Sequence, residues 1–376
     1  MYSVKIENGR VFDSNRNAFA KSSIILNGDR IETVGSHISS DEAAVKIDAS
    51  NLYVTAGFID FHGHFFEKGT DIGVDPDLTS LPFGITTVGD AGSTGISNFE
   101  SFLSLVVKPS RVTIRCFLNV SPSGLITTQF HENVNPTVID EDKISMLYRT
   151  HKEIILGLKL RMSKEVVLEH GMKPLKKIRS IADKLGCRLN IHATNPAGSI
   201  ADILQYLKSG DIFTHIFHGK GQTIIDKGEI LPEILNARTC GIIFDASNGA
   251  NHFSFDVAQK AVKCGFLPDI ISTDITKNTL MKPPVFSLIH VLSKYLNMGV
   301  SLEHIIPACT KTPAKIMGLD ANIGDISPGK KADITLFNII DQNTRFTDFV
   351  NKALIGEKYI EPVITIKNGV ILYLNH

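Results

Sequence analysis

The sequence predicts an α/β fold: a (β/α)8 TIM barrel with a small antiparallel β-sandwich domain formed by both termini. Short apolar segments alternate with amphipathic segments of helical spacing between about Gly157 and Thr276. Strands that are apolar on both faces are typical of a parallel sheet covered by helices. The two ends of the chain show instead the alternating polarity and frequent turns of exposed antiparallel strands.

Eight segments have the character of buried barrel strands. They cover residues 54–64, 84–90, 111–120, 154–160, 187–193, 211–217, 241–247 and 269–275. Eight strand–helix units over about 265 residues favour a closed barrel, with an open doubly wound sheet as the alternative. No G-x-G-x-x-G turn follows an early strand, which argues against a dinucleotide-binding fold.

Four amphipathic segments between these strands predict helices within 174–186, 199–210, 228–241 and 254–265. Each ends in a glycine immediately before the next strand: Gly186, Gly210, Gly241 and Gly265. Glycine adopts the left-handed conformation that closes a helix and reverses the chain. The spacing therefore predicts helices that pack back onto the sheet.

Residues 1–53 and 322–376 are expected to form the β domain together, and residues 54–321 to form the metal-dependent barrel. An Asn-Gly pair in each end segment, at Asn8–Gly9 and at Asn368–Gly369, predicts a two-residue hairpin turn.

Composition excludes several kinds of partner. The chain has 39 Lys and Arg and 39 Asp and Glu, so nothing favours nucleic acid or an anionic membrane. A small-molecule substrate is the expected partner, and a homo-oligomer remains open. Five scattered cysteines without a C-x-x-C pair indicate buried, reduced thiols, and no apolar leader is apparent, so we expect a cytoplasmic protein.

Metal-binding candidates begin at the first barrel strand, which ends in F-I-D-F-H-G-H and carries His62 and His64. Side chains two apart on a strand point to the same side, so both imidazoles can face the barrel mouth. Such a pair alone is weak evidence, because two histidines often occupy ordinary structural positions. The other strands provide the support.

Lys159 lies at the end of the fourth strand, in G-L-K-L-R-M-S. A charged lysine is costly to bury, so it needs a partner or a lowered pKa. A salt bridge at the barrel end is one interpretation. The other is a carbamate: a neutral amine reacts with carbon dioxide and becomes a carboxylate able to bridge two metals.

Three more polar residues end later strands: His192 the fifth, His215 the sixth and Asp274 the eighth. Active-site residues of this architecture gather at the carboxyl ends of the strands. Imidazoles and carboxylates suit zinc and similar divalent cations, with manganese, cobalt or iron as alternatives. Two such ions can share a bridging hydroxide, and Asp274 can accept its proton as a general base.

Together these motifs resemble the amidohydrolase superfamily. The resemblance rests on V-T-A-G-F-I-D-F-H-G-H, the strand-four lysine, the two later histidines, D-I-T and the ending I-G-D-I-S-P-G-K-K-A-D-I-T-L-F. It covers essentially the whole chain, and G-L-K-L-R-M-S with T-H-I-F-H-G-K is similar to the deacetylase and dihydroorotase-like branch near D-aminoacylases. The resemblance implies two divalent ions, one on His62, His64 and Asp274, the other on His192 and His215, with carboxylated Lys159 bridging.

One position departs from that branch. Thr276 follows Asp274 where a histidine would be expected, so a substrate or proton-relay contact is in doubt. Further candidates lie nearby. Arg161 and His218 are the predicted substrate-binding residues, with an ion pair and a loop histidine as the respective alternatives. Asp60 could support a ligand imidazole. Asn195, Asn248 and His252 in neighbouring loops have no assigned role.

The predicted function is a binuclear metal-dependent amidohydrolase. It would cleave an amide or ester bond in a small acylated amino or hydroxy acid, or a cyclic amide, through a bridging hydroxide. A dihydroorotase-like enzyme, a one-metal purine or pyrimidine deaminase and a phosphotriester hydrolase, which shares the same ligands, are the alternatives within enzymes. A binding or scaffold protein that has lost catalysis is the alternative outside them. Lys159 argues against the deaminase, and the complete ligand set argues against the scaffold.

Overall fold

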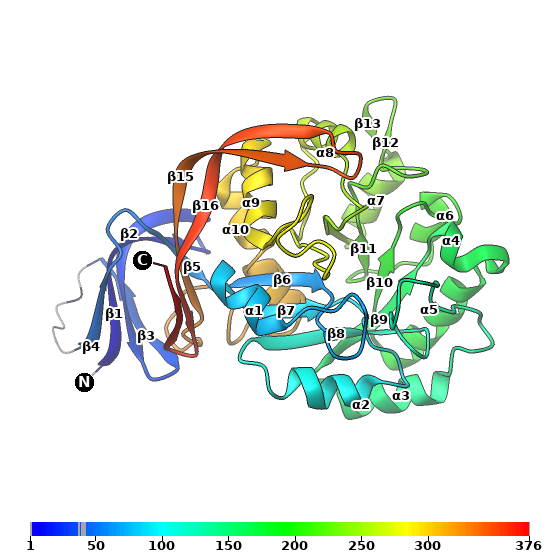
Figure 1. Cartoon of the computed structure of the whole chain (residues 1–376), viewed down its shortest axis with the longest axis horizontal. Helices are drawn as coiled ribbons and strands as arrows, with labels where there is room; N and C mark the ends of the chain where they lie inside the picture. Colours follow the sequence, from blue (N-terminus) through cyan, green and yellow to red (C-terminus); the bar gives the residue numbers. More distant parts are fainter. Residues whose placement is uncertain (1, 37, 39–42, 376) are drawn as a thin grey trace.

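The computed structural model describes residues 2–36, 38 and 43–375. Its chain forms two connected parts, a β sheet that contains both termini and an α/β part that holds most of the helices (Figure 1). Within the described ranges, none of the helices combines the length and the apolar character needed to cross a bilayer.

A parallel sheet is the centre of the α/β part. Its strands are hydrogen-bonded in chain order: β6 (Phe58–Gly63), β7 (Ile85–Asp90), β8 (Thr113–Asn119), β9 (Ile155–Arg161), β10 (Arg188–His192), β11 (Ile212–Thr214) and β14 (Ile243–Asp245). The segment 270–275 makes one parallel bridge to each edge strand, Asp245 with Ile270 and Gly63 with Ile275. The predicted α/β class is confirmed, and the eighth segment lies between the two edges as isolated bridges.

Helices connect these strands, and three more (α9, α10 and α11) follow segment 270–275. They are α1 (Pro76–Ser80), η1 (Leu81–Phe83), α2 (Phe99–Phe102), η2 (Leu103–Val107), α3 (Glu141–Thr150), α4 (Lys164–Val167), η3 (Leu168–His170), α5 (Lys173–Leu185), α6 (Ile200–Leu204), α7 (Pro232–Thr239), α8 (Phe255–Lys263), α9 (Leu288–Asn297), α10 (Leu302–Ala308) and α11 (Lys311–Ile316). All four predicted helices form, although α6 ends six residues before Gly210. The four closing glycines have φ between 64° and 89°, as their position requires.

The terminal sheet contains β1 (Tyr2–Asp13), β2 (Ala18–Asn27), β3 (Arg30–Gly35), β4 (Ala43–Asp48), β5 (Tyr53–Ala56), β15 (Ile334–Thr347), β16 (Ala353–Lys367) and β17 (Val370–Leu374). The path runs β17-β16-β15-β5-β1-β2-β3, with β4 also paired to β1. Both termini contribute, as expected, but the sheet is mixed because β1 runs parallel to β4 and β5. Alternating polarity reveals a strand with two unlike faces and says nothing of its neighbour's direction.

The two Asn-Gly pairs behave differently. Asn368 and Gly369 have φ of 49° and 77° and join β16 to β17, which confirms that hairpin. The turn predicted at Asn8–Gly9 is wrong: both residues lie inside β1, where the register against β2 shifts between Ile6 and Gly9. Asn8 takes a φ of 62° at this bulge, so the pair supplies a left-handed residue without ending the strand.

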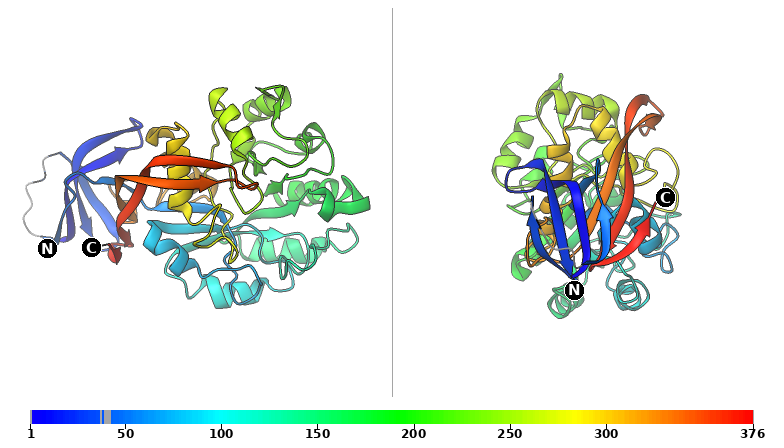
Figure 2. Two further views of the ribbon diagram at one scale, coloured as in Figure 1. Left: turned by 45° about the horizontal axis from the view of Figure 1, so that its top comes forward. Right: turned by 90° about the vertical axis from the view of Figure 1, so that its left-hand side faces the viewer.

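A long ribbon ties the two parts together. β15 and β16 leave the terminal sheet and extend along the α/β part, as two further views show (Figure 2). Phe346 and Ile360 on this ribbon belong to the main hydrophobic core, and the Ile360 amide donates to Oγ of Ser293 on α9 at 2.9 Å. The terminal sheet has a smaller core of its own around residues such as Ile24 and Val54.

All five cysteines are free in the structure. Cys116, Cys187 and Cys309 are buried as expected, whereas Cys240 and Cys264 are exposed. Both exposed thiols lie just after the last residue of a helix, on the solvent side of α7 and α8.

Candidate metal centre

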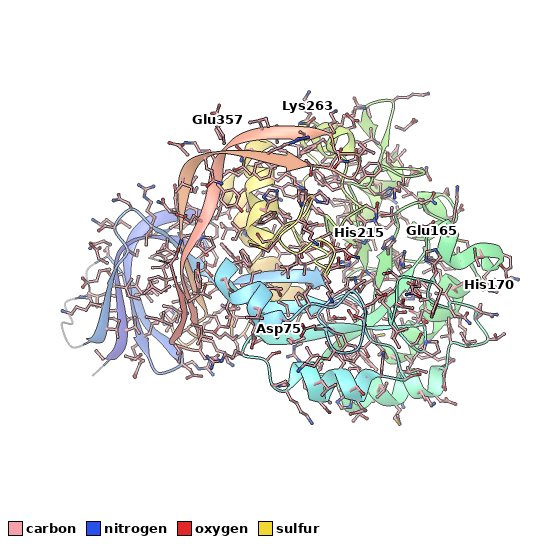
Figure 3. The ribbon with its side chains drawn as sticks, in the orientation of Figure 1. Asp75, Glu165, His170, His215, Lys263 and Glu357 are labelled. Atoms are coloured by element: carbon pink, nitrogen blue, oxygen red, sulfur yellow. The ribbon has the colours of Figure 1, made fainter. Side chains whose placement is uncertain are left out.

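A cavity of about 270 Å³ opens at the carboxyl ends of the parallel strands. Its lining includes all six side chains predicted from the sequence to bind metal: His62, His64, Lys159, His192, His215 and Asp274. Figure 3 shows His215 within the α/β part, while Glu165 and His170 lie toward its outer edge. The structure therefore brings together side chains from five different strand ends.

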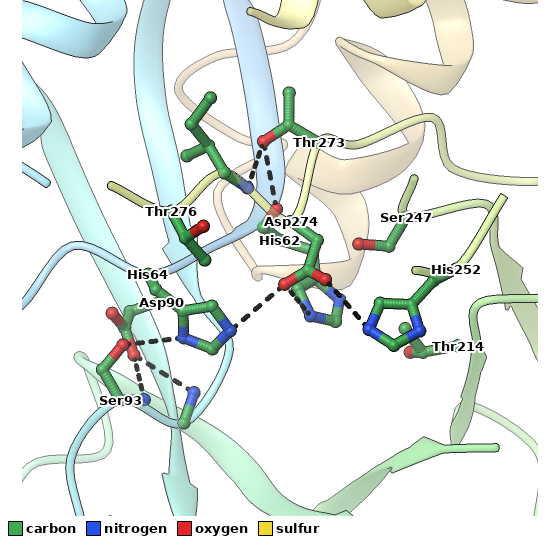
Figure 4. A network of polar contacts seen from close by, with 12 residues as sticks. His62, His64, Asp90, Ser93, Thr214, Ser247, His252, Thr273, Asp274 and Thr276 are labelled. Carbon is green, nitrogen blue, oxygen red and sulfur yellow. Dashed lines mark hydrogen bonds and ion pairs between the residues drawn. The ribbon is translucent and has the colours of Figure 1, made fainter. Parts of the chain in front are cut away.

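One group of possible ligands consists of His62, His64 and Asp274. Oδ1 of Asp274 lies 3.2 Å from Nε2 of His64 and 3.7 Å from Nε2 of His62. Figure 4 marks a contact from this carboxylate to each of the two imidazoles. Two imidazole nitrogens and a carboxylate oxygen facing one point are a donor set that suits zinc.

A second group consists of His192, His215 and His252. The ring centroids of His192 and His215 are 4.3 Å apart, and those of His62 and His215 are 5.1 Å apart, so the two groups adjoin. Burial lowers the pKa of His62, His192 and His215 well below the usual value. Neutral imidazole is the form that binds metal.

Lys159 lies on β9 and lines the cavity. Its Nζ donates to Oδ1 of Asn190 at 3.0 Å and lies 3.4 Å from Nε2 of His62. The side chain is buried, and burial lowers the pKa of its amine to about 8 against the opposing effect of Asp274. A Cβ on Gly92 would lie 2.8 Å from Cβ and Cγ of Lys159, so glycine at 92 makes the room that this side chain occupies.

Hydrogen bonds fix the orientation of three of the candidate ligand rings. Nδ1 of each ring has a partner at 2.9 Å: Asp245 Oδ2 for His62, Ser93 Oγ for His64 and the Ser247 carbonyl for His215. Metal-binding histidines typically use one nitrogen for the ion and the other for such a bond. The remaining Nε2 atoms are thereby directed to the centre of the cavity.

The predicted role of Asp60 as support for an imidazole ring is wrong. Its carboxylate accepts from the Thr273 amide at 3.0 Å and from Oγ1 of Thr273 at 2.5 Å, so it fixes the eighth segment instead. Asp245 holds the His62 ring. Asp245 ends β14, and burial raises its pKa to about 7. In the sequence, Asp245 stands at a strand end in D-A-S, where a functional carboxylate could be expected. Its partner His62 is 183 positions away, so the pairing could not be predicted.

The backbone at two of the candidate ligands is strained. His215 has a φ of 67° and Asp274 a φ of 54°, in the left-handed region that residues other than glycine rarely adopt. The His215 amide donates to the Asp245 carbonyl and the Asp274 amide to the His62 carbonyl, which hold both residues in place. Such conformations cost about 1–3 kcal/mol each and concentrate at functional sites.

Burial would raise the pKa of Asp274, but hydrogen bonding to His64 and the surrounding imidazoles outweigh it, and the pKa lies below its usual range. Asp274 therefore stands as a carboxylate, the form that accepts protons and binds cations.

The two predicted substrate-binding residues lie in different surroundings. Arg161 lines the cavity, and its Nη1 donates to Oε2 of Glu132 at 2.9 Å. His218 is fully buried beside the site and does not line the cavity, so the structure gives it no surface on which to contact substrate. Its amide donates to the His215 carbonyl. The short distance along the chain from His215 predicts a loop above the site, but the side chain is buried instead.

The remaining candidates also separate. Thr276 lines the cavity, and its hydroxyl lies 3.3 Å from that of Thr279. Asn195 bonds to Glu165 at 2.9 Å, outside the cavity lining. Asn248 is buried behind the site. Glu132 was missed by sequence reasoning, because the long segment between β8 and α3 gives no indication of how it folds over the strand ends.

Comparison with known proteins agrees with this geometry. Residues 53–372 match the Amidohydrolase family. A deacetylase of Agrobacterium fabrum is 34% identical over 330 residues, 86% of this chain and 80% of that protein. A crystal structure of an adenine deaminase has a TM-score of 0.91 and 29% identity, and each chain is covered completely. A crystal structure of a dihydroorotase has a TM-score of 0.90 and 30% identity, over 100% of this chain and 98% of the other. The chain belongs to the amidohydrolase family, as its motifs predicted, and is a hydrolase of that superfamily.

Proposed function

We propose that this protein is a binuclear metal-dependent deacylase of small acylated amino or hydroxy acids. The observation that carries the proposal is one cavity lined both by the buried carboxylate of Asp274 and by the guanidinium of Arg161. The first is a proton acceptor, and the second is a partner for a carboxylate. The deacetylase of A. fabrum, at 34% identity, supports this substrate class.

The donor set fits two divalent ions, for which zinc is our proposal. His62, His64 and Asp274 would hold one ion and His192 and His215 the other, with Lys159 between them. Ions of this kind lower the pKa of water toward about 7 and polarise a carbonyl oxygen. The burial and hydrogen-bonded rings of the site are the properties that such a centre requires.

Lys159 would serve as a carboxylate after modification. The neutral amine forms an N–C bond with carbon dioxide and releases one proton, which leaves a carbamate anion on the side chain. The buried position of Nζ, next to the uncharged Asn190 and His62, supports a neutral amine.

Asp274 would move the proton. A water molecule attacks the substrate carbonyl, its proton passes to the Asp274 carboxylate, and the acid returns it to the leaving nitrogen or oxygen as the acyl bond breaks. Nε2 of His64 and of His62 lie within 3.7 Å of Oδ1 and orient the carboxylate. Arg161 would bind the substrate carboxylate and thereby position the acyl group over Asp274.

We propose the domain organisation expected from the sequence. A closed (β/α)8 barrel over 54–321 carries the catalytic site, and segments 1–53 and 322–376 form one β domain. The bridges of segment 270–275 to both edge strands support the closed barrel. The sheet order, which joins β15–β17 to β1–β5, supports a single β domain.

The test is hydrolysis by the purified full chain with two equivalents of zinc and with bicarbonate. The panel contains N-acyl and O-acyl acids, their amide-capped analogues and a cyclic amide. We expect turnover of an acylated acid and little turnover of its capped analogue. Turnover of the cyclic amide alone would favour the dihydroorotase-like alternative, and full activity of Lys159→Ala would contradict the mechanism.

A further inference from the structure

A fourth imidazole lies in the cavity, on the loop after β14. His252 was given no role from its sequence, yet it lines the cavity with His192 and His215. Its ring centroid lies 4.2 Å from that of His215 and 4.8 Å from that of His192. One ligand nitrogen from each of the three residues lies within 4.8 Å of the other two, so the three rings surround one point.

The ring of His252 is oriented like the rings of the predicted ligands. Its Nδ1 lies 2.9 Å from Oγ1 of Thr194, the distance at which Nδ1 of His62, His64 and His215 meets its own partner. Its Nε2 is directed inward and lies 3.7 Å from Oδ2 of Asp274. A ring held at Nδ1 with Nε2 free is the usual arrangement of a metal ligand.

Asp274 connects the two groups. Its Oδ1 faces His62 and His64, while its Oδ2 faces His252 (Figure 4). Gly249, which has a φ of 53°, lets the loop approach this carboxylate closely. A Cβ at 249 would lie 2.3 Å from Asp274 Oδ2 and 2.5 Å from Cδ2 of His252, so a side chain there would displace one of them.

Hydrogen bonds among buried groups hold this loop in position. Nζ of Lys294 on α9 donates to Oδ1 of Asn248 at 3.1 Å, and Nδ2 of Asn248 donates to the Ala246 carbonyl at 2.7 Å. Because Asn248 and Lys294 are both fully buried, the loop has little freedom to lift His252 out of the cavity.

We propose that His252 is a third imidazole ligand of the metal position formed by His192 and His215, an inference that rests on the proposed metal centre. Three histidines supply the three protein ligands that a catalytic zinc site needs, and they leave a position open. This position would then keep its ion without the carbamate of Lys159. Thr194, through Nδ1 of His252, is a positioning residue.

Cobalt binding by the full chain tests this inference. Wild type, His252→Gln, Thr194→Val and His131→Gln are titrated with Co²⁺, and metal content and visible absorption are measured. His131 is the matched control, since it lines the same cavity and its ring has no hydrogen bond among the described residues. In His252→Gln and in Thr194→Val, we expect the affinity for one of the two Co²⁺ ions to fall at least about 10-fold and the visible spectrum to change. We expect His131→Gln to bind both ions as wild type does.

Unchanged affinity and spectrum in His252→Gln would overturn the inference and leave the proposed function standing, whereas a wild type that binds no cobalt would defeat the proposed function itself. A crystal structure of the cobalt-loaded wild type decides the matter even if a variant fails to fold. Nε2 of His252 at about 2.0–2.1 Å from an ion, a bonding distance, supports the inference, and a ring turned away from both ions overturns it.

Discussion

Nη1 of Arg161 donates to Oε2 of Glu132 at 2.9 Å on the wall of the cavity. Nε of Arg161 and Oε1 of Glu132 have no hydrogen-bond partner in the described part of the chain. Because both of these atoms are buried, the donors left for a second carboxylate are the remaining N–H groups on the Nη atoms of the guanidinium, which Glu132 holds in place. Under the proposed function, this pair would select for a substrate that carries a carboxylate.

Arg161→Met, combined with Glu132→Gln so that no buried charge is left unpaired, is expected to raise KM for an acylated acid by about 10- to 100-fold. A hydrogen bond to a charged group is worth about 1.5–3 kcal/mol, which sets this range. Steady-state kinetics with the acid and with its amide-capped analogue measure the effect. Equal losses for both substrates would show that Arg161 does not bind the carboxylate.

Asp274→Asn is expected to lower kcat by about 10²–10⁴-fold, because the amide has the shape of the carboxylate but cannot take up a proton. Rates are compared per bound metal ion, since Asp274 is also a candidate ligand. A variant that keeps its metal and turns over at the wild-type rate would remove Asp274 from the mechanism.

Much of this site could be predicted because its residues stand at strand ends, where the parallel arrangement makes them neighbours whatever the loops do. His62 and Lys159 needed only the strand period and the order of the strands. His252 and Glu132 could not be found this way, because their positions depend on loop conformations such as the positive φ of Gly249. The turn at Asn8–Gly9 was predicted wrongly for a similar reason, because a left-handed residue occurs in a β-bulge as well as in a turn.

Gly92→Ala is expected to destabilise the fold by about 1–3 kcal/mol and to reduce metal content. Gly92 has a φ of 92°, and the added Cβ would meet Lys159 at 2.8 Å. Gly171→Ala is the matched control, with a φ of 52° and no atom within 4 Å of the added Cβ. Urea denaturation and metal analysis should show lost metal in Gly92→Ala only; equal metal content in both variants would contradict the assigned role of Gly92.

Lys294 should make stability depend on pH. Burial lowers the pKa of this amine to about 7, whereas a lysine in the unfolded chain titrates near about 10.4. The unfolded chain therefore binds more protons between about pH 7 and 10, and the contribution of Lys294 to stability rises with pH across that window. The free energy of unfolding of wild type should increase from about pH 7 to 9 relative to that of Lys294→Met. If the free energies of unfolding of wild type and Lys294→Met changed equally with pH, the pKa of Lys294 would not be lowered by burial.

The most direct measurement is anomalous diffraction at the zinc edge from crystals of the zinc-loaded full chain grown with bicarbonate. We expect two peaks, one among His62, His64 and Asp274 and the other beside His192 and His215, with the density of a carbamate on Lys159. A single peak with an unmodified lysine would point to the one-metal deaminase, and no peak in this cavity would contradict the account altogether.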